Sequence, residues 1–119
     1  MLTSAARFAY LQSLYTDARR IGLENNFPDP RSEAQLKGRH LMRIISRGKL
    51  NLDRVEITMG EDGSLEVTAA LESKLVVVDI PPTGSRFEMV VEDNLAKQLI
   101  ASFPQATEEK LIYWLSGKD

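Results

Sequence analysis

The spacing of hydrophobic residues changes once along this chain, near residue 50, and this change constrains the fold more than any other feature. Before it, apolar residues recur every three or four positions, as on one side of an α-helix. After it, they alternate with polar residues, as in a strand with one buried face. A run of helices followed by a run of strands is typical of the α+β class with an antiparallel sheet.

The first half of the chain predicts two helices. They should cover residues 4–21 and about 33–47, joined by a connector over residues 24–31 that contains two prolines and two asparagines. Arg7 interrupts the apolar side of the first helix, where it should either extend toward solvent or pair with an acid.

The second half predicts strands and then helices. Four strands are expected, at residues 55–59, 65–71, 75–80 and 86–91, with Asp62-Gly63 turning the first hairpin. Two helices should follow, one beginning at Asp93 and running through Phe103, and a short one beginning at Thr107. The expected order is αα-ββββ-αα, in a single α+β domain of residues 1–119. Its four-stranded antiparallel meander should carry the helices on one face.

Residues 24–30 (Glu-Asn-Asn-Phe-Pro-Asp-Pro) and 62–67 (Asp-Gly-Ser-Leu-Glu-Val) carry a likeness to other proteins. Together with the helix and strands around them, they span about residues 24–92. This part of the chain resembles a group of small, mostly uncharacterised bacterial α+β proteins. That group has a G-N-W-D-G-like loop followed by a β-meander, and some members are encoded near toxin–antitoxin pairs. Phe27 stands where the group usually has Trp. The resemblance implies a fold but transfers no catalytic residue.

Several chemistries lack their usual residues. The absence of cysteine excludes a disulfide scaffold, a thiol nucleophile and Cys-liganded zinc. No phosphate-cradling glycine motif and no nucleophile motif occurs, and His40 is the only histidine. We therefore expect no enzyme activity, catalytic residue, metal, cofactor or small-molecule substrate. The longest apolar run, Leu75 to Val78, is too short for a membrane, and no signal peptide is recognisable. These features favour a cytoplasmic protein that binds no membrane.

Charge is distributed unevenly along the chain. Residues 1–49 hold nine Lys and Arg against four Asp and Glu, whereas residues 50–119 hold six against thirteen. Arg39, Arg43 and Arg47 form a basic stripe on the second expected helix, with Lys37 beside it. This stripe is either a solvated surface, a contact for nucleic-acid phosphates, or a contact for an acidic protein or a second copy of the chain.

Two further sets of residues fall on the strands. Glu56, Glu66 and Glu88 should share one face of the sheet, as a solvated surface, a partner-binding surface, or a metal or acid–base site. If the helices cover the face of Val55, Val67 and Phe87, the other face is left with an apolar patch. That expected protein-interface patch consists of Val76, Val78, Ile80 and Val90.

The sequence therefore favours a small non-enzymatic protein-interaction or regulatory module, whose partner is another protein or a second copy in a homodimer. The alternative is a nucleic-acid-binding regulator that uses the basic second helix.

Overall fold

The computed structural model of this protein describes residues 2–117. The helices are α1 (Ser4–Glu24), α2 (Ser32–Arg47), the 3-10 turn η1 (Leu52–Arg54) and α3 (Glu108–Trp114). The strands are β1 (Val55–Met59), β2 (Leu65–Ala70), β3 (Lys74–Ile80), β4 (Glu88–Asp93) and β5 (Leu99–Phe103).

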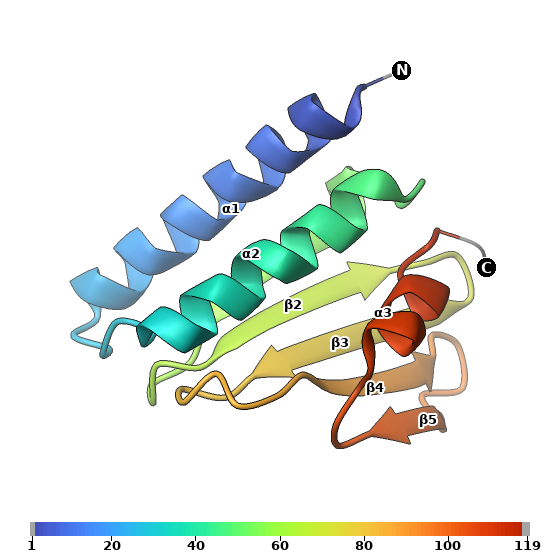
Figure 1. Cartoon of the computed structure of the whole chain (residues 1–119). Helices are drawn as coiled ribbons and strands as arrows, with labels where there is room; N and C mark the ends of the chain where they lie inside the picture. Colours follow the sequence, from blue (N-terminus) through green and yellow to red (C-terminus); the bar gives the residue numbers. More distant parts are fainter. Residues whose placement is uncertain (1, 118–119) are drawn as a thin grey trace.

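The fold has two layers, with helices over one face of an antiparallel sheet (Figure 1). The sheet has five strands in the order β1-β2-β3-β4-β5, so each strand pairs with its neighbour in sequence. In Figure 1, α1 and α2 run side by side above the sheet, and α3 lies on the same side over β3 and β4. The α+β class, the antiparallel meander and the helices on one face are confirmed.

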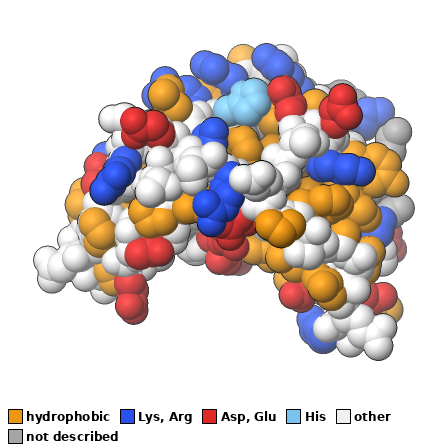
Figure 2. Space-filling model, turned by 60° about the horizontal axis from the view of Figure 1, so that its bottom comes forward, with side chains coloured by type: hydrophobic (Ala, Val, Ile, Leu, Met, Phe, Trp, Pro, Cys, Tyr) orange, Lys and Arg blue, Asp and Glu red, His pale blue; other side chains and the backbone are white. Residues whose placement is uncertain are grey.

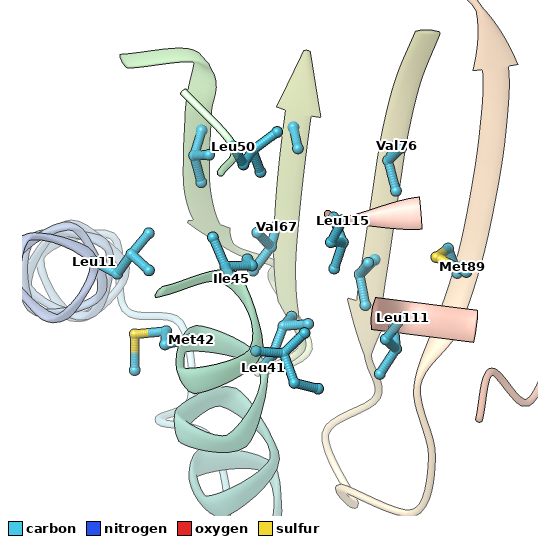
Figure 3. Close-up of a cluster of buried hydrophobic side chains, with 14 of the residues drawn as sticks. Leu11, Leu41, Met42, Ile45, Leu50, Val67, Val76, Met89, Leu111 and Leu115 are labelled. Atoms are coloured by element: carbon cyan, nitrogen blue, oxygen red, sulfur yellow. The ribbon is translucent and has the colours of Figure 1, made fainter. Parts of the chain in front are cut away.

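The core lies between these layers. Figure 3 shows side chains from α1, α2 and α3 pointing toward the sheet, among them Leu11, Leu41 and Leu111. They form one buried cluster with the inward side chains of β1 to β4. Residues of that cluster on the sheet are Val55, Leu65, Val67, Ala69, Val76, Val78, Ile80, Met89 and Val91. Burial of this apolar area is the main term that holds the two layers together.

The predicted four strands and αα-ββββ-αα order are wrong in one segment: the chain after Asp93, expected to form a helix, forms a turn and the fifth strand. Asp93 Oδ1 accepts hydrogen bonds from the backbone N–H groups of Leu95 and Ala96, each at 2.8 Å. Lys97 takes a left-handed conformation with φ 57°, and the N–H of Asp93 donates to the carbonyl of Gln98. The aspartate side chain therefore stabilises a β-turn instead of capping a helix.

Arg7 takes neither of the two roles expected from the sequence. Its Nε donates to the carbonyl oxygen of Ser46 at 3.1 Å. Its Nη2 donates to the carbonyls of Ile45 at 3.2 Å and Leu50 at 2.8 Å. Ile45 and Ser46 belong to the last turn of α2, where carbonyls have no partner within the helix. Arg7 thus caps α2 from α1, with its positive charge at the negative end of the helix dipole.

Candidate functional site

The predicted basic residues of α2 differ in their local surroundings. Arg39, Arg43 and Arg47 are all exposed, and none forms an ion pair within residues 2–117. Arg43 lies over the ring of Phe8 in α1, 5.6 Å from its centroid. Lys37 points to the other side of α2, 5.4 Å from the ring centroid of Phe87.

The two ends of the stripe border different hollows. Arg39 lines a narrow cleft against α1. Arg47 lines a cavity of about 430 Å³ between the end of α2 and α3, together with Lys49, Ile112 and Glu108. His40 lies nearby on the surface, with Nε2 3.7 Å from Glu108 Oε1. The three arginines therefore follow one side of α2 but have different neighbours.

The predicted apolar patch on the uncovered face is wrong for three of its four residues. Val76, Val78 and Ile80 are fully buried beneath the helices. Strand pairing explains this, because Val78 lies opposite Val67 and therefore shares its face. Of the patch, only Val90 lies on the uncovered face, where it is half-buried opposite Val77. A one-residue difference in register moves a whole strand from one face to the other.

The uncovered face is acidic. Glu56, Glu66 and Glu88 share it as expected, and Asp79 lies between Glu66 and Glu88 in the register. Arg86 pairs with Glu88 at 2.6 Å. Burial, followed by the charges of Glu66 and Glu88, raises the pKa of Asp79 to about 6. In Figure 2, acidic side chains lie at the centre of the hollowed lower side. Across the part of the chain that the structure describes, no group of three His, Asp or Glu is arranged to hold a metal ion.

The two edge strands of the sheet, β1 and β5, differ in their charge and in the elements that lie beside them. β1 lies against α1 and carries Glu56. β5 forms the opposite edge, and its sequence Leu-Ile-Ala-Ser-Phe contains no charged residue. Leu99 is 63% exposed and Ile100 is 45% exposed. A register shift between Val91 and Glu92 leaves Ile100 as an extra residue in this strand, a β-bulge.

Exposed hydrophobic side chains extend beyond β5. Figure 2 shows them gathered over β5 and α3, beside the acidic hollow. Ile112 and Tyr113 of α3 and Leu95 of the β4–β5 turn are also exposed. This edge was not expected from the sequence, because the segment from Asp93 through Phe103 was predicted to form a helix.

The chain matches no protein-family model, no curated protein and no solved structure. The resemblance of residues 24–92 to small bacterial proteins stays a prediction. Within residues 2–117, no helix combines the length and the apolar character needed to cross a membrane.

Proposed function

We propose that this chain is a non-enzymatic protein-interaction module that associates with a second copy of itself through β5. The observation that carries the proposal is the edge position of β5, an uncharged strand with exposed Leu99 and Ile100. An edge strand presents a row of backbone N–H and C=O groups that can pair with another strand. Charged residues are one common protection of such an edge, and β5 has none.

A second copy fits this edge better than a charged partner does. Two β5 strands that run antiparallel across a two-fold axis would join both sheets into one, and each copy would supply the same surface. The pairing would satisfy outward backbone groups on both strands and bury Leu99 and Ile100 of both copies. Because β5 carries no charge, no like charges of the two strands would lie opposite each other.

The other exposed surfaces suit self-association less well. The uncovered sheet face would bring Glu66, Asp79 and Glu88 of one copy against the same acids of the other. The edge of β1 carries Glu56 and lies against α1. These features leave β5 as the contact that a symmetric pair can form at the lowest electrostatic cost.

The test is the mass of the protein in solution across a dilution series, by sedimentation velocity. The wild-type chain should have the mass of a dimer at high concentration. Leu99→Lys and Ile100→Lys should each give a monomer, because a lysine on an edge opposes strand pairing. Leu95→Lys is the matched control. This leucine is 89% exposed but lies in the turn outside β5, so the Leu95→Lys variant should still form a dimer. A wild-type monomer at every concentration, or dimers of both β5 variants, would reject the proposal.

A second candidate function is nucleic-acid binding by α2. Arg39, Arg43 and Arg47 are exposed and outside the ion pairs formed by residues 2–117, so their charges are available to phosphates. Three phosphate contacts predict a log–log slope of binding constant against salt of about −2.7 on duplex DNA. Replacement of the three arginines by glutamate should abolish this binding and leave the β5 dimer intact. Absence of binding at low salt would reject this candidate alone.

A further inference from the structure

A polar cleft of about 100 Å³ lies between α1 and α2, at the side of the molecule away from β5. Its lining residues are Gln12, Tyr15, Thr16 and Arg19 of α1 and Gln35, Arg39 and Met42 of α2. A water molecule takes roughly 30 Å³ in the liquid, so the cleft has room for about three waters or one small ion. Its lining is mostly polar, which distinguishes it from the cavity at the end of α2.

The side chain of Tyr15 gives the cleft an unusual feature. Tyr15 is only 9% exposed, and its Oη is buried without a hydrogen-bond partner within residues 2–117. Buried hydroxyl groups in folded proteins are nearly always hydrogen-bonded, because an unmet bond is costly. The tyrosine ring lies close to Gly38, whose lack of a side chain lets α1 and α2 approach each other here. This hydroxyl is therefore a buried, unsatisfied donor on a residue that lines the cleft, and an acceptor in the cleft reaches it only after neighbouring side chains move.

Two arginines place positive charge around this hydroxyl. Arg39 is exposed and has no ion pair in the described part of the chain. Arg19 is held by Asp29, with Nε 2.9 Å from Oδ1 and Nη2 bonded to Oδ2, and its guanidinium lies 5.8 Å from the centroid of the Tyr15 ring. Since Asp29 neutralises one of the two arginines, the net charge of these three groups is that of Arg39.

We propose that this cleft binds phosphate, with the Tyr15 hydroxyl and the Arg39 guanidinium as donors to its oxygens. A guanidinium matches the geometry of phosphate oxygens and forms strong charge-assisted bonds with them. Arg19, paired with Asp29, also lines the cleft and lies beside the Tyr15 ring. The proposal concerns residues outside β5, so it does not depend on the self-association proposed above.

The two donors can be removed separately, and removal of the Tyr15 hydroxyl should not destabilise the protein without ligand, which makes the test specific. Inorganic phosphate is titrated calorimetrically into the full chain in chloride buffer, and thermal unfolding is measured in phosphate and in chloride at equal ionic strength. Arg39→Gln should weaken phosphate binding at least tenfold. Tyr15→Phe should also weaken it at least tenfold, yet unfold in chloride at a temperature no lower than wild type, because it removes an unpartnered hydroxyl. Arg43→Gln, on the same helix but outside the cleft, should bind like wild type.

Phosphate also stabilises proteins non-specifically by exclusion from their surface. Equal stabilisation of wild type, Tyr15→Phe and Arg39→Gln, with no calorimetric binding, would therefore overturn the proposal. A lower unfolding temperature of Tyr15→Phe in chloride would also overturn it, because the hydroxyl would then contribute to the fold itself. O-phosphoserine, titrated in parallel, identifies the source of the group: binding as tight as that of phosphate indicates a phosphomonoester on a larger ligand, and binding of inorganic phosphate alone indicates the free ion.

Discussion

The contact between Arg7 and the end of α2 predicts a large and specific loss of stability. Arg7→Met keeps the aliphatic stem but removes the hydrogen bonds to the carbonyls of Ile45, Ser46 and Leu50. A hydrogen bond to a charged group contributes about 1.5–3 kcal/mol. The three bonds share one guanidinium and do not add, so we expect the free energy of unfolding to fall by about 3 kcal/mol. For a chain of this length, that corresponds to a fall in melting temperature of roughly 10–15 °C.

Urea unfolding followed by circular dichroism measures this loss. The midpoint should fall with little change in the slope, because the unfolded chain exposes the same surface. Arg7→Lys should recover part of the stability, since an ammonium keeps the charge but lacks the planar fork. Arg43→Met is the control: this exposed arginine lies over the Phe8 ring and forms no ion pair within residues 2–117, so its loss should stay below about 1 kcal/mol. Equal losses for Arg7→Met and Arg43→Met would refute the capping role.

Three further substitutions test the packing and the acidic face. Gly84 has φ 69° and meets the backbone of Ala34, so Gly84→Ala should lower the free energy of unfolding by about 2–4 kcal/mol in urea titrations. Leu111 anchors α3 with no exposed surface, and Leu111→Ala should lower it by about 2–5 kcal/mol. The pKa of Asp79 is raised to about 6 from 3.8, so the folded state holds its proton more tightly than the unfolded chain does. Stability should therefore rise as pH falls from 7 to 5, by on the order of 1 kcal/mol for this partly exposed carboxyl. Asp79→Asn should flatten that rise, and an unchanged pH profile would contradict the assignment.

Local sequence signals predicted much of the fold. The helical spacing in the first half indicated α1 and α2, and Asp62-Gly63 indicated the β1–β2 hairpin, in which Gly63 has φ 88°. These features depend on neighbouring residues, so a single sequence contains them. The segment after Asp93 was ambiguous, because Leu95, Leu99 and Phe103 fit a helix while Leu99, Ala101 and Phe103 fit a strand. Pairing with β4 decides this case, and such pairing is not a local property.

The candidate sites depend on contacts between distant residues, and there the sequence was less informative. The faces of β3 follow from its register with β2, which places Val76, Val78 and Ile80 inside. The cleft at Tyr15 combines α1 with α2, and Tyr15 looked like an ordinary core residue in the sequence. The three arginines of the basic stripe are exposed, as the sequence predicts. Their different neighbours, however, follow from the packing of α1 and α3 against α2.

Backbone hydrogen exchange of β5 tests the self-association of this chain most directly. Exchange of the Leu99–Phe103 amides is measured by NMR at a high and a low protein concentration. If β5 pairs with β5 of a second copy, the outward amides of this strand should exchange more slowly at the higher concentration, while those of β1, the other edge strand, should not change. Equal exchange of the β5 amides at both concentrations would contradict the account.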